Sequence, residues 1–420
     1  MNDELLTNTT PQQETAILAG VDTGAYNAEQ SIQELWALAE SAEITPLASM
    51  LQKREKPDNA AFLGEGKLEE LAALVQAQEA DMVIFDDELT GTQLKNCEEA
   101  LGCQVLDRTL LILDIFARRA KTSESKMQVE LARLQYLLPR LSGMGHALSR
   151  QGGGGAGGTG ARRGAGESKL EMNRRTIRER ISFLNEKLAE AQVQKQATRR
   201  RREKSEVPVI ALVGYTNVGK SSLLNALCDS EVEERDMLFA TLSPTARSYK
   251  LESGQEVIFV DTVGFVSRLP HQLVKAFRST LEEAKYADVL LVVCAADDAA
   301  ADVQLAVTGE VLSDLGCEGE QIIVYNKCDV APREVGQGAM RVSAKTREGL
   351  PQLLQAVEDK LSARIALITV LLPYSESALA ANLRQVGQVH EEEFLPQGVR
   401  IKATVPVRHL YRYEQFYVNP

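Results

Sequence analysis

One eight-residue segment, Gly214 to Ser221, constrains this 420-residue chain more than any other, because its sequence GYTNVGKS has the spacing of a P-loop. The apolar run VPVIALVG (207–214) leads into it and predicts a buried strand, whereas SSLLNALC follows it and predicts a helix. Glycines let such a loop wrap a pyrophosphate, and its backbone N–H groups and the helix dipole point at the phosphate oxygens. Lys220 would then reach the β- and γ-phosphates, and the Ser221 hydroxyl would ligate Mg²⁺.

A second motif, Asp261-Thr-Val-Gly264, follows the apolar strand sequence EVIFV. An acidic residue at a strand end beside the P-loop can hold Mg²⁺ through water, and Gly264 can offer its backbone N–H to the γ-phosphate. DxxG is a weak signal alone. It gains weight because two further motifs follow it in the order and at the strand ends that a GTPase requires.

Those two motifs predict a guanine site. In Asn326-Lys-Cys-Asp329, after the strand sequence QIIVY, the carboxylate can accept two hydrogen bonds from the guanine N1–H and N2–H₂ edge, which adenine cannot supply. Lys327 would cover the face of the base. In Ser343-Ala-Lys345, the Ala344 amide would meet guanine O6.

Three positions bear on hydrolysis. GTPases need a threonine that ligates Mg²⁺ and closes over the γ-phosphate, and FATLS (239–243) offers Thr241, with Thr245 as the competitor. Phe265 follows Gly264 where many GTPases have a water-orienting glutamine, so intrinsic hydrolysis should be slow and partner-dependent. Asn217 leaves two interpretations open: it supplies an oxygen to K⁺ beside the phosphates, or it only braces the loop.

The predicted catalytic residues are Lys220, Thr241 and Gly264, and the predicted Mg²⁺ ligands are Ser221 and Thr241. The predicted nucleotide contacts are Gly214, Tyr215, Thr216, Asn217, Val218, Gly219, Lys220, Ser221, Ser222, Phe239, Ala240, Thr241, Leu242, Ser243, Asp261, Thr262, Val263, Gly264, Asn326, Lys327, Asp329, Ser343, Ala344 and Lys345.

Residues 14–120 alternate between short apolar runs and helical patterns, which predicts a small α/β domain with a partly parallel sheet. AAFLG and DMVIF are the expected strands; EQSIQELWALAESA, KLEELAALVQAQ and GTQLKNCEEAL are the expected helices. FLGEGK lacks P-loop spacing and is interpreted as a turn. At the other end, IALITVLLP, a helical stretch and VRIKATVPV predict a small α+β domain over 365–420.

Residues 121–204 form a concentrated basic segment. They carry 19 Lys and Arg against 8 Asp and Glu, a local charge of +11 in a chain whose net charge is −12. Apolar seams, one from Met127 to Leu141 and one from Leu170 to Leu188, predict two long antiparallel helices joined by a flexible Gly/Arg tip, residues 151–166. The alternatives are a disordered linker between unrelated helices and a solvated charged surface.

Arginine forks phosphate oxygens, so the predicted RNA contacts are Arg162, Arg163, Arg174, Arg175 and Arg178. Composition is typical of a soluble chain, no run approaches the roughly 18 apolar residues of a membrane span, and the acidic N-terminus has no signal-peptide pattern. The six cysteines show no CxxC pair and are interpreted as reduced packing residues. We therefore expect a cytoplasmic protein.

Over nearly its whole length the chain resembles the HflX family of bacterial GTPases, which are related to the Obg group. The resemblance is carried by ILDIFARRA (112–120), VELARLQYLLPRL (129–141), GAGESKLEMNRR (164–175), GYTNVGKS, FATLSPTAR (239–247) and DTVGF (261–265). The Gly-rich tip followed by a helix is its most particular feature. The chain departs from the family pattern at GAGESKLE and FATLSPTAR, where GPGE-x-x-LE and FATLDPTTR are usual, and neither change removes a phosphate or metal ligand.

The resemblance implies an α/β multidomain fold: residues 14–120 as an N-terminal α/β domain, 121–204 as the basic hairpin, 207–362 as a P-loop GTPase domain with a mixed, mostly parallel sheet, and 365–420 as a C-terminal α+β domain. It implies GTP and Mg²⁺ as cofactors. It also implies that the GTP form binds the large ribosomal subunit and its rRNA, and that it splits or rescues stalled ribosomes under stress. A nucleotide-switched RNA-binding or anti-association factor and a ribosome-assembly GTPase remain the alternatives. A monomer is compatible with every feature.

Overall fold

The computed structural model describes residues 14–142, 162–205, 207–228, 245–266, 268, 283–331, 335–336, 338–362 and 365–418. The chain divides into two compact units. The first holds the N-terminal residues as far as Glu190 and also includes Val266 and Arg268; the second holds the P-loop region and the C-terminal residues. Each unit is described by itself. No helix within the described ranges is long and apolar enough to cross a membrane.

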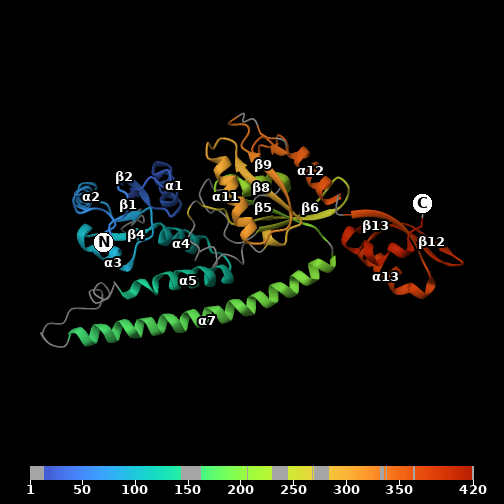
Figure 1. Ribbon diagram of the computed structural model, residues 1–420, viewed down its shortest axis with the longest axis horizontal. Helices are drawn as coiled ribbons and strands as arrows, with labels where there is room; N and C mark the ends of the chain where they lie inside the picture. Colours follow the sequence, from blue (N-terminus) through green and yellow to red (C-terminus); the bar gives the residue numbers. More distant parts are fainter. Residues whose placement is uncertain are drawn as a thin grey trace, which may run out of the picture. The chain divides into compact units, whose positions relative to one another are not determined.

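The first unit is built on a four-stranded sheet whose strands are all parallel, in the order β2-β1-β3-β4. Helices connect the strands in a doubly wound arrangement (Figure 1). The strands are β1 (Thr15–Asp22), β2 (Thr45–Lys53), β3 (Met82–Phe85) and β4 (Gln104–Asp107). The helices are α1 (Ala28–Ser41), α2 (Glu65–Gln78), α3 (Gly91–Leu101) and α4 (Arg108–Arg119).

Both faces of this sheet are buried, as expected of a parallel sheet. On one face Ile17, Ala19 and Val21 of β1 pack with Leu71 of α2 and Leu94 of α3. Leu18, from the same strand, is fully buried on the opposite face. The α/β prediction for this region is therefore confirmed, and its sheet is wholly rather than partly parallel.

One expected strand is wrong. AAFLG (60–64) forms a turn in which Asp58 and Phe62 exchange two backbone hydrogen bonds, while the Asp58 carboxylate accepts from the N–H groups of Ala60 and Ala61. Sequence reasoning missed three strands, β1, β2 and the short β4. β1 and β2 contain Gly20 and Pro46, which lower strand propensity. Pairing with neighbouring strands outweighs that local preference.

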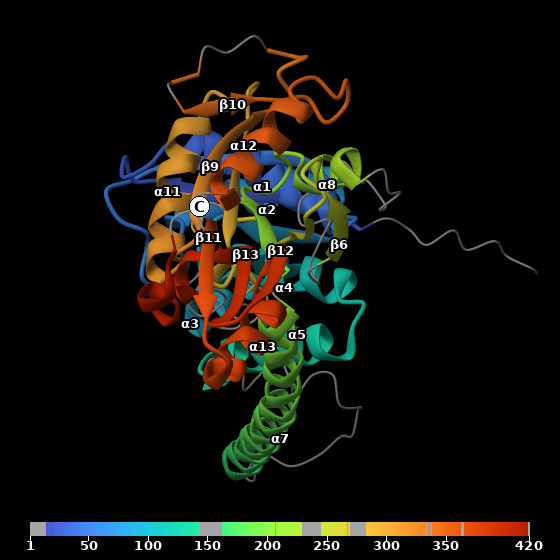
Figure 2. The ribbon, with the colours of Figure 1, turned by 90° about the vertical axis from the view of Figure 1, so that its right-hand side faces the viewer.

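Two helices follow. They are α5 (Ser123–Leu137), with the short 3₁₀ helix η1 (Arg140–Ser142) after it, and α7 (Arg162–Ser205), which belongs to the first unit as far as Glu190. In Figures 1 and 2, α5 runs beside the first part of α7. Arg180 of α7 donates to both carboxylate oxygens of Glu130 on α5, at 2.7 and 2.9 Å, and Leu184 of α7 is fully buried. The two predicted helices are present and joined by this ion pair, while residues 143–161, which include most of the predicted tip, fall outside the described residues.

The tip differs from its predicted limits. Residues 151–161 lie outside the described ranges, but residues 162–166 belong to α7 and not to a loop. Gly164 and Gly166 each cost about 1 kcal/mol in a helix relative to alanine. The arginine, glutamate, lysine and leucine residues around them are good helix formers, and the helix they start is 44 residues long.

The second unit contains a six-stranded sheet in the order β10-β9-β8-β5-β7-β6, parallel except where β6 pairs with β7. This confirms the mixed, mostly parallel sheet. The strands are β5 (Val209–Gly214), β6 (Thr245–Lys250), β7 (Glu256–Asp261), β8 (Val289–Ala295), β9 (Glu320–Asn326) and β10 (Ala339–Arg341). Three helices pack on it: α8 (Lys220–Cys228), α11 (Ala301–Asp314) and α12 (Leu350–Ser362).

Residues 365–418 form a three-stranded antiparallel sheet, β11 (Ile365–Leu372), β13 (Gly398–Pro406) and β12 (Gln388–Leu395), beside helix α13 (Ser377–Val386) (Figure 2). The expected α+β character holds, and β12 is a strand that sequence reasoning missed. Val370, Ile401 and Tyr413 belong to a core of their own. All six cysteines are free thiols, three of them buried.

Candidate functional site

The P-loop is a tight turn between β5 and α8, and its backbone requires unusual residues. Gly219 has φ +85°, and a Cβ there would lie 2.4 Å from Nδ2 of Asn326, so only glycine fits. Asn217 has φ +60°, in the left-handed region that asparagine tolerates better than most residues. This backbone requirement explains an asparagine at position 217 whatever else its side chain does.

Lys220 lies at the start of α8 with its amine folded onto the loop. The Nζ atom donates to the carbonyl oxygens of Gly214 at 3.1 Å and Tyr215 at 2.6 Å. Burial lowers the pKa of Lys220 to about 8, and the negative charge of Asp261 opposes that shift. The negative charge of a bound phosphate would raise the pKa of this amine again and so favour its protonated form.

Ser221 and Asp261 lie together beneath the loop. The Ser221 Oγ donates to Oδ2 of Asp261 at 2.6 Å, and the Asp261 side chain is buried at the end of β7. A hydroxyl and a carboxylate are hard oxygen donors of the kind that Mg²⁺ prefers, and Mg²⁺ in nucleotide sites uses few protein ligands besides phosphate. The donor set therefore fits magnesium.

Asn326, at the end of β9, ties two predicted motifs together. Its Nδ2 donates to the carbonyl oxygens of Val218 at 2.9 Å and Gly219 at 3.4 Å, and its Oδ1 accepts from the Ala344 N–H at 3.0 Å. Sequence reasoning placed Asn326 at the nucleotide but missed this bridging role. The Ala344 amide, expected to meet guanine O6, is here engaged by Asn326.

Asp329 is exposed, as a residue that reads a ligand must be. Its carboxylate accepts from the Oγ of Ser343 at 2.7 Å, and Ser343 is itself fully buried and accepts from the Thr346 N–H. Ser343 therefore positions the carboxylate without consuming its second oxygen. Lys327, between Asn326 and Asp329, has φ +63°.

The DTVGF segment runs along the edge of the P-loop. The Phe265 N–H donates to the Gly214 carbonyl at 3.0 Å, and the Thr216 N–H donates to the Phe265 carbonyl at 2.8 Å. A Cβ on Gly264 would lie 2.8 Å from the Cα of Thr216 in the P-loop, so only glycine permits this approach. The Phe265 side chain is buried in the core of the second unit.

Other predicted contacts divide into two groups. Thr262 is fully buried and its hydroxyl donates to the Leu212 carbonyl at 2.7 Å, so its side chain serves the sheet. Phe239, Ala240, Thr241, Leu242 and Ser243 lie outside the described residues. The competitor Thr245 begins β6, opposite Asp261 in the β6–β7 ladder. The structure thus brings together the P-loop, Asp261–Gly264, Asn326–Asp329 and Ser343–Lys345.

The predicted RNA contacts all lie on α7, away from these motifs in the sequence. Arg175 and Arg178 are exposed and Arg174 is half-buried, with Arg175 bonded to Glu179 one turn on. Arg162 and Arg163 begin the helix, and their side chains lie outside the described residues.

A mostly parallel sheet with a P-loop after β5, a serine bonded to a buried aspartate beside that loop and an Asn-Lys-x-Asp turn at the end of β9 define a P-loop GTPase domain. Comparison with known proteins agrees. A sequence family described as "50S ribosome-binding GTPase" matches residues 209–327. Families described as "GTP-binding GTPase N-terminal" and "GTP-binding GTPase Middle Region" match residues 29–117 and 119–202.

The relatives narrow the class. GTPase HflX of Caldanaerobacter subterraneus subsp. tengcongensis is 47% identical over 97% of this chain and 94% of its own length. GTPase HflX of Escherichia coli K12 is 39% identical over 90% of each. A solved GTP-binding protein from Sulfolobus solfataricus, in complex with GDP, is 25% identical, with a TM-score of 0.47, over 83% of this chain and 99% of that one. The chain belongs to the HflX family and is a GTPase.

Proposed function

We propose that the GTP form of this protein binds the large ribosomal subunit through its basic hairpin, and that it splits or rescues stalled ribosomes under stress until GTP hydrolysis releases it. The observation that carries this is the exposed arginine face of α7, on a helix that is anchored to α5 by Arg180 and Glu130. Exposed arginines on a fixed helix suit a polyanion whose phosphates are recognised by position and shape. The match of residues 209–327 to a family described as "50S ribosome-binding GTPase" supports the same partner.

Sedimentation of ribosomes with the protein and a non-hydrolysable GTP analogue tests the proposal. We expect the protein to travel with the large subunit and intact ribosomes to fall apart. R162A/R163A should reduce co-sedimentation, while K187A, an exposed change on the same helix, should not. Binding that is independent of nucleotide would refute the requirement for the GTP form. Equal binding of R162A/R163A and K187A would refute the hairpin as the contact.

At the nucleotide site, we propose that Lys220 and the P-loop amides hold the phosphates, Ser221 and Thr241 ligate Mg²⁺, Asp261 holds it through water, and Asp329 selects guanine. The ion would neutralise phosphate charge. Lys220 would be recruited from its carbonyl partners to the phosphate, and Gly264 would donate its N–H to the γ-phosphate. Asn217 is a candidate oxygen donor for K⁺. A comparison of GTP hydrolysis rates in KCl and NaCl tests this role of Asn217. Equal rates would rule out a K⁺ ion at this site.

A second candidate is an RNA-binding or anti-association factor that uses nucleotide only as a switch. The observation in its favour is Phe265, which buries its side chain in the core where many GTPases present a glutamine to water. Multiple-turnover GTP hydrolysis with and without large subunits separates the two. Stimulation by the subunit supports the first candidate, and its absence supports the second.

A ribosome-assembly GTPase that shares only the nucleotide-binding domain is a third candidate. It predicts that deletion of residues 151–161, which leaves α7 whole, does not change ribosome binding. Loss of binding in that deletion would favour the hairpin.

A further inference from the structure

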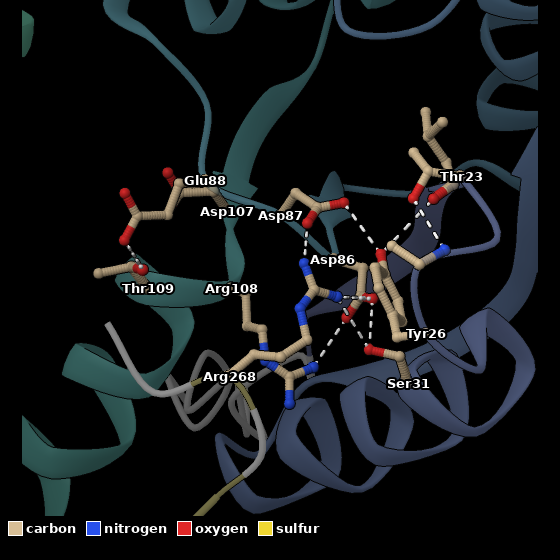
Figure 3. A network of polar contacts seen from close by, with 12 residues as sticks. Thr23, Tyr26, Ser31, Asp86, Asp87, Glu88, Asp107, Arg108, Thr109 and Arg268 are labelled. Carbon is tan, nitrogen blue, oxygen red and sulfur yellow. Dashed lines mark hydrogen bonds and ion pairs between the residues drawn. The ribbon is translucent and has the colours of Figure 1, made fainter. Parts of the chain in front are cut away.

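Three aspartates lie at the ends of three adjacent strands of the N-terminal sheet. Asp22 and Asp107 are the last residues of β1 and β4, and Asp86 directly follows β3. The order β2-β1-β3-β4 makes the β1/β3 boundary the point where successive connections leave in opposite directions. Ligands of open α/β sheets bind in the crevice at that point. Here a side chain of the same chain, Arg268, enters it (Figure 3).

Arg268 makes four contacts in this crevice. Its Nη1 donates to Oδ2 of Asp86 at 2.9 Å and to Oγ of Ser31 at 3.1 Å, and its Nη2 pairs with Asp87. Its guanidinium lies 4.0 Å from the centre of the Tyr26 ring. We call Ser31, Tyr26, Asp86 and Asp87 the arginine seat. The guanidinium contacts two carboxylates with separate nitrogens and also stacks on the Tyr26 ring. A lysine ammonium has no planar fork to do both, so the site suits a guanidinium.

Without Arg268 the seat would keep one cation, Arg108, which is shared between Asp86 and Glu34. Asp86 is buried, and its other oxygen already accepts from Arg108 at 2.7 Å. Arg108 is buried too and reaches Glu34 with its second nitrogen. Removal of Arg268 would therefore leave Asp86 with a buried cation and with the Ser31 hydroxyl, which donates to it at 2.6 Å.

Arg268 is held at a cost that makes the seat reversible. Its φ is +57°, a left-handed conformation that costs a non-glycine residue roughly 1–2 kcal/mol. Its side chain keeps 29% of its exposure, so solvent can replace the carboxylates. A strained, part-exposed ion pair can be exchanged for contacts with solvent.

Arg268 also stands at a sensitive place in the chain, three residues after Phe265 and four after Gly264. Phe265 is fixed on the P-loop edge by its two backbone hydrogen bonds. In that arrangement the Thr216 N–H donates to Phe265 and is not directed at a phosphate. If a γ-phosphate draws the Gly264 N–H toward itself, the displacement would be passed along the chain toward Arg268, four residues on.

We propose that Arg268 is a positioning residue for this segment: its occupation of the arginine seat favours the arrangement without a γ-phosphate, and GTP binding and seat occupation oppose one another. The inference rests on the proposed role of Gly264 at the γ-phosphate. By thermodynamic linkage, occupation of the arginine seat lowers the affinity for GTP, and GTP binding lowers the occupation of the seat by the same factor. The N-terminal domain thereby reads the nucleotide through one side chain.

The test compares affinities for fluorescent GDP and a fluorescent non-hydrolysable GTP analogue, without ribosomes. R268A should raise the affinity for the GTP analogue relative to GDP by about 5- to 10-fold, within the usual range of coupling between sites. D87N should shift the ratio in the same direction by less, and R268A/D87N should not exceed R268A alone. R268K, which keeps the charge but not the fork, should fall between wild type and R268A.

R400A, which breaks an exposed ion pair with Glu393 in the C-terminal sheet, is the matched control and should leave the ratio unchanged. An unchanged ratio in R268A, or additive effects of R268A and D87N, would overturn the proposal. If the wild-type protein bound neither nucleotide, that result would instead contradict the assigned nucleotide site. The two failures are therefore distinguishable. Thermal unfolding of each variant confirms that it is folded.

Discussion

Asp329 combines exposure with a fixed orientation, since the Ser343 hydroxyl holds one of its oxygens. We expect D329N to weaken GTP binding by about 100-fold, because the amide would present a donor to the guanine N1–H donor. The same variant should gain affinity for xanthosine triphosphate, whose C2 carbonyl accepts a hydrogen bond where guanine has its N2–H₂ donor. An Asn side chain can still accept from Ser343, so the unfolding midpoint should stay close to wild type. Competition between the two nucleotides is the measurement.

Lys220 carries a second prediction, which concerns protons. With its pKa lowered to about 8 by burial, about half of the molecules lack this charge at pH 8 and about a tenth at pH 7. A bound phosphate raises that pKa again, so nucleotide binding should take up about half a proton at pH 8 and far less at pH 7. Calorimetry in buffers of different ionisation enthalpy measures the uptake. Equal uptake at both pH values, or the same uptake in K220R, would contradict the assignment.

Residues with a chemical signature could be predicted from the sequence, and those defined by geometry could not. GYTNVGKS, DTVG and NKCD are short motifs whose residue spacing follows from how a nucleotide is bound, so the sequence alone could predict them as the nucleotide site. The bridging of Val218 and Ala344 by Asn326, and the seat of Arg268, depend on contacts between residues far apart in the chain. The weak signal for Arg268 was its place soon after DTVGF.

At the scale of elements, local pattern succeeded where a helix has one apolar face and failed where a strand owes its existence to its neighbours. The helix over 91–101 was predicted to the residue, with Thr90 and Gln93 forming a capping box. β1 and β2 were missed because neither alternates nor is rich in β-branched residues. The opposite error occurred at AAFLG. Its apolar run predicts a strand, but the Asp58 carboxylate holds it in a turn.

Helix α7 supports a prediction of its own. Val193 is an exposed residue inside this helix. V193P removes a helical hydrogen bond and clashes with the preceding turn, at a cost of about 3 kcal/mol or more. We expect it to bend α7 and to reduce binding to the large subunit, with nucleotide affinity unchanged. V193A, which keeps the helix, should bind as wild type does. Co-sedimentation gives the answer, and equal binding of V193P and V193A would count against a straight helix as a requirement.

At the scale of the whole molecule, charge is separated rather than balanced. The segment 121–204 carries +11, while the remainder carries −23. An acidic protein that binds RNA through one basic element should bind weakly at high salt. We expect the logarithm of the binding constant to fall linearly with the logarithm of salt concentration. R174A/R175A/R178A should make that slope shallower, while R400A should not; an unchanged slope would argue against α7 as the phosphate contact.

The length of α7 has a mechanical consequence. Its 44 residues extend over about 66 Å, and three residues after its end the chain enters β5, the strand that leads into the P-loop. A rotation of about 5° at Ser205 would carry the Arg162 end through about 6 Å, roughly one helical turn. A stiff rod of this length acts as a lever arm. Small displacements at its base would become large ones at its Arg162 end, and a force applied at that end would return to the base with the same leverage.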